Sequence, residues 1–234
     1  MMKTKILSRD YINKNNTKFI ISSHISSYKH ALPKLIESLI RNDISEKNII
    51  SVVGGCESKF QKDNIIFADH NSYDHTAIIE IIESELQSKY WFALHDTCEA
   101  GPDFFLKLSE YRITKPYIAL TEMAWMNMGL FSNQYIQKNK DYILSLKNCS
   151  KVRAILSERV YSRLDDYTWF GLQEGHQRIR DCKNIYNDEK KRDVLYFPFL
   201  DLYKFQSYDA LKVMKPLWIY KIVNYYIVKW GMEH

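Results

Sequence analysis

The chain has 234 residues, of which 46% are hydrophobic and 26% charged, a composition typical of a folded globular protein. The net charge is only +5, and basic and acidic residues alternate along the sequence without forming a basic cluster. We therefore expect no nucleic-acid partner. The four cysteines form no Cys-x-x-Cys pair, which argues against zinc knuckles, redox motifs and disulfides. Seven glycines and five prolines leave no candidate linker, so a single domain spanning residues 1–234 is expected.

Strands and helices alternate through the first half of the sequence. Continuous apolar runs predict strands, and apolar residues three or four apart predict helices. The strands are expected at 18–24, 48–55, 64–68, 90–94 and 116–121, and the helices at 30–41, from 71 or 72 to 86, and from 102 to 108. This order favours an α/β fold with a mainly parallel sheet, helices on both faces, and ligands bound beyond the carboxyl ends of the strands.

The second half is less regular. Helices are expected at 134–146 and 151–164, and an aromatic segment follows at 193–205. Residues 217–230 form an amphipathic pattern with Trp and Tyr beside Lys, which is compatible with lying on an anionic membrane or with packing against the domain. No apolar run approaches the roughly 20 residues that span a bilayer, so a cytoplasmic location with peripheral membrane contact through 217–230 is expected.

One carboxylate stands where the predicted sheet should bind ligands. The common dinucleotide, phosphate-loop, zincin and hydrolase motifs are absent from the sequence. Asp96, however, follows the strand at 90–94 and precedes a turn containing Gly101 and Pro102, so we expect its carboxylate to project, exposed, from the edge of the sheet. Mg²⁺ or Mn²⁺ can bind there, because these ions take one or two protein carboxylates and complete their shell with water and phosphates. The alternative is that Asp96 only caps the following turn.

The succession FIISSH, NIISVVGG, NIIFADHN, YWFALHDTCEAGPDFF, PYIALT and MNMGLFSNQYI resembles the GT-A fold glycosyltransferases over residues 18–146. In that family the fourth such strand ends in an Asp-x-Asp motif that binds a metal and the donor diphosphate. A later segment of glycine, aromatic and small residues precedes an acceptor-side helix, a place that residues 127–132 occupy here. This chain departs from the motif: its 95–98 segment reads His-Asp-Thr-Cys, so Asp96 is the one aspartate and metal dependence stays open.

The resemblance implies an enzyme that moves a sugar from a nucleotide-diphosphate sugar to a carbohydrate or lipid-linked acceptor, with Asp96 binding Mn²⁺ or Mg²⁺. It further implies a nucleotide-binding part at 18–120 and an acceptor-side part at 121–234. The donor-binding candidates are Ser22, Ser23, His24, Glu57, Asp69, His95, Asp96, Asn127 and Gly129. An inverting transfer would also need a carboxylate base to deprotonate the acceptor hydroxyl. The candidates for that base are Glu122, Glu158, Asp165 and Asp166.

Other functions remain open on the sequence alone. A nucleotidyltransferase would share the sheet and the diphosphate chemistry, although the loop SSHISSYKH lacks the glycines usual in those enzymes. A non-catalytic domain that binds a sugar or a partner is compatible with the single aspartate. The cluster of Asp, His, Asn and Tyr at 69–75 could also hold a metal, but its members lie across a strand end and a helix start.

Overall fold

The fold was analysed in a computed structural model, which describes residues 10–121, 127–157, 161, 164, 167–171, 177–182 and 192–206. An eight-stranded sheet, called here the main sheet, has the order β3-β4-β2-β1-β5-β8-β7-β9. Its strands are β1 (Thr17–His24), β2 (Ile49–Gly54), β3 (Phe60–Lys62), β4 (Ile65–Phe67), β5 (Tyr90–His95), β7 (Tyr117–Ala119), β8 (Gly129–Ser132) and β9 (Tyr167–Trp169).

The main sheet is mixed and mostly parallel, as expected. β1 pairs in parallel with β2 and β5, β2 with β4, and β7 with β9. β8 is antiparallel to both β5 and β7, and the short β3 is antiparallel to β4. Strands from both parts of the chain, 18–120 and 121–234, therefore belong to one sheet.

A second sheet is antiparallel and was not expected. Its order is β10-β11-β12-β6, with β6 (Cys98–Ala100), β10 (Gln177–Cys182), β11 (Arg192–Phe197) and β12 (Leu202–Gln206). Since only two residues separate β5 from β6, Asp96 and Thr97 form the turn at which the chain passes from the main sheet to the second sheet. The aromatic segment at 193–205 thus forms most of β11 and β12.

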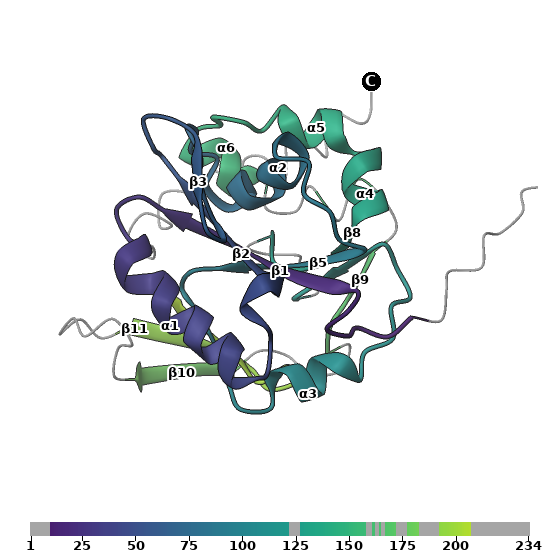
Figure 1. The fold of residues 1–234 in the computed structure, drawn as a ribbon. Coiled ribbons are helices and arrows are strands. Elements are labelled where there is room, and N and C mark those ends of the chain that lie inside the picture. Colours follow the sequence, from purple (N-terminus) through teal and green to yellow (C-terminus); the bar gives the residue numbers. More distant parts are fainter. Residues whose placement is uncertain are drawn as a thin grey trace, which may run out of the picture.

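Helices cover both faces of the main sheet, as Figure 1 shows. α1 (Tyr28–Arg41) and α3 (Phe104–Ser109) lie on one face, which we call the α1 side. The opposite face, the α2 side, carries α2 (Thr76–Glu83), α4 (Asn133–Lys138), α5 (Lys140–Leu144) and α6 (Lys151–Leu156). Short 3₁₀ turns, η1 (Glu46–Asn48) and η2 (Tyr73–His75), precede β2 and α2. No helix within the described ranges is long and apolar enough to cross a membrane.

The expected helix at 134–146 is wrong in one respect, because it is two helices. Asn139 ends α4 and precedes α5 with a non-helical backbone, and its side-chain amide donates to the Tyr135 carbonyl oxygen at 2.9 Å. Asparagine side chains compete in this way with the helical hydrogen bonds of the backbone. The chain therefore turns at Asn139 and wraps α5 over the sheet.

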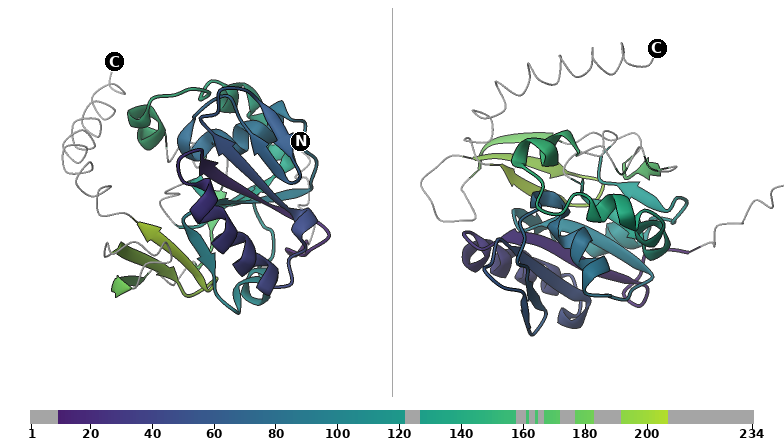
Figure 2. Two further views of the ribbon diagram at one scale, coloured as in Figure 1. Left: turned by 60° about the vertical axis from the view of Figure 1, so that its left-hand side comes forward. Right: turned by 90° about the horizontal axis from the view of Figure 1, so that it is seen from above.

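Each face of the main sheet has its own hydrophobic core, because strand side chains alternate between the two faces. Phe19 and Phe92 pack on the α1 side against helices α1 and α3. Ile20 and Trp91, their neighbours in sequence, pack on the α2 side. The second sheet lies on the α1 side, beside α1 (Figure 2), and contributes to the core there. The same alternation decides which face each polar residue at the strand ends occupies.

Candidate functional site

The order of the main sheet reverses beside β1. The chain proceeds from β1 to β2 and β4 on one side, and then returns to place β5 on the other side of β1. In open α/β sheets, ligands bind in the crevice outside the carboxyl ends of the two strands at such a switch point. The residues at this switch point are Ser22, Ser23 and His24 of β1, with His95 of β5 and Asp96 of the following turn.

Asp96 is held rigidly at the switch point. Its Oδ2 accepts hydrogen bonds from the hydroxyls of Ser23, at 2.7 Å, and Ser27, at 3.0 Å. Its backbone N–H donates to the Ser22 carbonyl oxygen at 2.9 Å. Since Ser27 immediately precedes α1, the carboxylate lies at the positive end of that helix dipole. The expectation of an exposed carboxylate is wrong: Asp96 is 8% exposed, because the serine hydroxyls replace much of its water.

His95 faces away from Asp96. Strand alternation directs His95 to the α2 side, where its Nε2 lies 3.5 Å from Oδ1 of Asp74 in η2. Asp96 instead contacts residues on the α1 side. The two neighbours therefore do not form one ligand set. Asp74 is a further carboxylate at this edge, and it belongs to the polar cluster at 69–75.

Ser22 and His24 have structural contacts of their own. The Ser22 hydroxyl accepts a hydrogen bond from the backbone N–H of Ala77, at the start of α2, at 3.3 Å. His24 Nδ1 accepts from the backbone N–H of Ser26 at 3.2 Å, and the ring lies against Gly55, where a Cβ would come within 2.8 Å of Nε2. These contacts shape the loops after β1 and β2.

Glu57 and Asp69 follow β2 and β4 at the same edge of the sheet, and both side chains are exposed.

Asn127 precedes β8 with a left-handed backbone, φ 50°, and is 1% exposed. Neither polar atom of its side chain has a hydrogen-bond partner among the described residues. Because Gly129 pairs with Ala93, Asn127 lies just past the end of β5, near His95.

Lys204 is a residue of this region that the sequence reading missed. It lies on β12, opposite Cys98 of β6, and its ammonium donates to the Thr97 hydroxyl. Although it is charged, Lys204 is only 8% exposed. The signal in the sequence was the spacing: Lys204 is two residues from the fully buried Leu202, so both side chains lie on the same face of a strand.

The four candidate bases, Glu122, Glu158, Asp165 and Asp166, lie outside the described residues, as does the segment 217–230.

Glu99, which follows Asp96 closely in the sequence, is positioned away from it. Its carboxylate pairs with Arg41 at 3.6 Å, near the last turn of α1, whereas Asp96 lies near the first.

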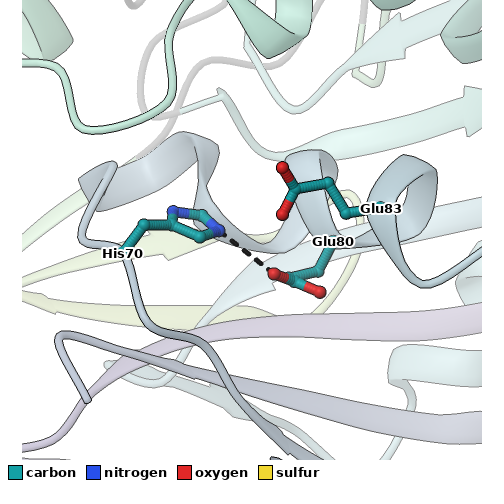
Figure 3. A group of neighbouring side chains, drawn as sticks. All are labelled: His70, Glu80 and Glu83. Carbon is teal, nitrogen blue, oxygen red and sulfur yellow. Dashed lines mark hydrogen bonds and ion pairs between the residues drawn. The ribbon is translucent and has the colours of Figure 1, made fainter. Parts of the chain in front are cut away.

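A group of three potential metal ligands lies elsewhere, on the α2 side. His70, Glu80 and Glu83 bring one ligand atom each within 4.8 Å of one another (Figure 3). His70 Nε2 lies 3.1 Å from Glu80 Oε1, and Lys59 lies 2.7 Å from Glu80 Oε2. Lys147 donates to both oxygens of Glu83, at 2.7 and 2.9 Å. Two lysines thus supply the positive charge that a metal would bring, so the group is better explained as a partly buried ion-pair network.

The titration of Glu80 agrees with this explanation. Burial by itself would raise the pKa of Glu80, but hydrogen bonds from His70, Lys59 and Ser84 outweigh it and lower the pKa to about 2. The network therefore holds Glu80 ionised in a fully buried position.

His75, the last residue of η2, is a second buried histidine. Its Nδ1 is 2.9 Å from the Tyr161 hydroxyl oxygen, and the residue is 0% exposed. Burial lowers the pKa of His75 from 6.5 to about 4, although Asp74 and the Ala154 backbone oppose the shift. His75 is therefore neutral in the folded protein at neutral pH.

The low pKa of His75 predicts acid sensitivity. The unfolded chain binds this proton near pH 6.5 and the folded chain only near pH 4, so the stabilising contribution is complete above pH 6.5 and is lost as the pH falls toward 4. The free energy of unfolding should fall by about 3 kcal/mol over this window. Urea unfolding at several pH values measures it.

In this experiment His75→Gln should flatten the pH profile, since glutamine does not titrate. His30→Gln, at an exposed position of α1, should leave the profile unchanged. Glu80 does not confuse the result, because its contribution is lost at lower pH, between about 4.5 and 2. Equal profiles for the wild type and His75→Gln would contradict the assignment.

Comparison with known proteins adds no assignment to this geometry: no protein-family model, no curated protein and no solved structure matches the chain.

Proposed function

We propose that the chain is a glycosyltransferase that moves a sugar from a nucleotide-diphosphate sugar to a carbohydrate or lipid-linked acceptor. The observation that carries the proposal is the carboxylate of Asp96, which two serine hydroxyls hold at the β1/β5 switch point of a mostly parallel sheet. Such crevices bind nucleotides in other open α/β proteins, and carboxylates there accept hydrogen bonds from ribose hydroxyls.

The arrangement of the strands supports the finer assignment to a GT-A-like fold. β5, which leads to Asp96, is the fourth parallel strand of the β1, β2, β4, β5 series along the chain. β8 begins at Gly129, runs beside β5 and leads directly into α4. The resemblance to GT-A enzymes assigns the donor diphosphate to the end of β5, at Asp96, and the acceptor side to the segment from β8 into α4. The adjacent strands β5 and β8 would thus bring donor and acceptor together.

The residues present do not fit a metal held by two aspartates. Cys98 stands at the second position of the Asp-x-Asp motif, fully buried, with its Sγ 3.6 Å from the Met128 sulfur. Burial raises the pKa of the Cys98 thiol to about 11, so it stays protonated, and a protonated thiol is not a metal ligand. Binding of Mn²⁺ or Mg²⁺ at Asp96 alone stays a prediction.

In this proposal, the residues at the switch point bind the hydroxyl groups of the donor without a metal. Asp96 already accepts hydrogen bonds from two hydroxyls, and a donor would offer further hydroxyls from its ribose or its sugar. Ser23 and Ser27 fix the direction of the carboxylate, so little conformational entropy is lost on binding. The remaining requirement is positive charge for the diphosphate.

A nucleotide screen tests the proposed function. UDP or GDP at about 100 times its Kd should stabilise the protein by about 2.7 kcal/mol, which corresponds to a rise in Tm of about 5–10 °C for a chain of this size. The measurement is thermal unfolding with UDP, GDP, UTP, GTP, UMP and GMP, each with Mn²⁺ or with EDTA. Preference for a triphosphate would indicate a nucleotidyltransferase instead, and indifference to every nucleotide would indicate a non-catalytic domain.

A further inference from the structure

Lys204 is a buried cation without an anionic partner in the described part of the chain. Within the described residues its ammonium donates one hydrogen bond, to the neutral hydroxyl of Thr97, and no described carboxylate forms an ion pair with it. The residue is 8% exposed, so water compensates little of its charge. Burying an ammonium is costly unless an anion or several hydrogen bonds offset the lost hydration. A bound anion would supply the partner that the described residues do not give to Lys204.

Lys204 lies at the turn that carries Asp96. Thr97, its hydrogen-bond partner, directly follows Asp96, and the Phe205 backbone N–H donates to the Thr97 carbonyl oxygen at 2.9 Å. β12 therefore forms hydrogen bonds with both the side-chain hydroxyl and the carbonyl oxygen of Thr97.

The amino end of α1 adds to the positive potential at the same place. The first turn of α1 contains no acidic residue, and the Ser27 hydroxyl does not cap the helix but donates to Asp96. The dipole of this 14-residue helix therefore acts on the Asp96 turn, where the Asp96 carboxylate is the acidic group nearest to Ser27. A buried ammonium and a helix amino end thus lie close to the one carboxylate at the switch point.

We propose that Lys204 binds the diphosphate of the nucleotide-sugar donor and supplies, without a divalent cation, the positive charge that the departing diphosphate needs. The identity of the ligand as a nucleotide rests on the proposed function, whereas the capture of a pyrophosphate group rests on Lys204 alone. The two residues then bind different groups of the donor: Lys204 binds the phosphates, and Asp96 accepts hydrogen bonds from hydroxyls.

The test measures binding in EDTA by titration calorimetry, with inorganic pyrophosphate, UDP, GDP and the matching monophosphates as ligands. Lys204→Met removes the charge at nearly constant length and should weaken pyrophosphate and diphosphate binding about 10- to 100-fold, the usual effect of losing a hydrogen bond to a charged group. Lys204→Arg should restore part of the loss, because it restores the charge.

Stability provides a second readout. A lone buried charge destabilises the empty protein, so Lys204→Met should raise the Tm of the ligand-free protein by about 2–4 °C, which also shows that the variant folds. Lys140→Met, at an exposed lysine on the α2 side, is the matched control and should change neither binding nor Tm.

The binding results distinguish the role of Lys204 from the proposed function. Wild-type protein that fails to bind pyrophosphate in EDTA, or a Lys204→Met variant that binds it equally well, would overturn the role of Lys204. Nucleotide binding that needs Mn²⁺ would overturn that role and leave the proposed function standing. Metal-free binding of pyrophosphate that depends on Lys204, with no affinity for any nucleotide, would support the anion site and defeat the proposed function.

Discussion

Replacing Asp96 with asparagine should lower the rate of the proposed sugar transfer by about 100-fold or more, the usual cost of removing a preorganised electrostatic group from an active site. Asparagine has the same shape as aspartate, and its carbonyl oxygen can still accept hydrogen bonds from the Ser23 and Ser27 hydroxyls. It lacks the negative charge, however, and presents an N–H₂ donor where the carboxylate presents an acceptor. The fold should survive while the chemistry is lost.

The measurement is hydrolysis or transfer from the nucleotide sugar selected by the thermal screen, with circular dichroism to confirm folding. Asp63→Asn is the matched control. Asp63 is exposed in the turn between β3 and β4, at the amino end of β4 and so at the edge of the sheet opposite the switch point. Its left-handed backbone, φ 53°, is one that asparagine tolerates. Full activity in Asp96→Asn would refute the assignment of the site.

Gly129→Ala should destabilise the protein by about 3–5 kcal/mol, through backbone strain and overpacking together. The glycine has φ 138°, and a Cβ there would come within 2.2 Å of the Ile118 carbonyl oxygen on the adjacent strand β7. Since β8 is hydrogen-bonded to β5 on its other side, it cannot move away from β7. Typical domains have a total stability of only about 5–15 kcal/mol, so the variant should be near the limit of folding.

Chemical denaturation measures this loss, and Ser132→Ala on the same strand provides the scale. The Ser132 hydroxyl accepts the Tyr135 N–H at the start of α4, so its removal should cost about 1 kcal/mol, the usual value for a helix cap. A Gly129→Ala protein as stable as Ser132→Ala, but with weakened donor binding, would show that Gly129 serves the ligand and not the sheet.

The elements of the first half were predictable from local pattern alone. The runs at 18–24, 48–55 and 90–94 form β1, β2 and β5, because continuous apolar strands between amphipathic helices require a sheet covered on both faces. The short strands β6, β8 and β9 escaped notice. A strand of three or four residues is too short to show a periodic pattern, and its stability comes from partners distant in the sequence.

The site was predicted in part. Asp96 follows a strand that is readable in the sequence, so its place at the carboxyl edge of the sheet is confirmed. Its burial was not predictable, because it depends on hydroxyls 69 and 73 residues away in the sequence, those of Ser27 and Ser23. Lys204 was missed for the same reason: its partner, Thr97, is 107 residues distant.

Local sequence, then, determined that this protein alternates strands and helices, has a mostly parallel sheet, and places a lone aspartate after one central strand. Only the tertiary structure decided which polar residues share a face. The packing of η2 brings Asp74 to His95, and the packing of the second sheet brings Lys204 to the Asp96 turn. The physical reason is that periodicity depends on residues a few positions apart, while burial and charge pairing depend on contacts that form only when distant segments pack together.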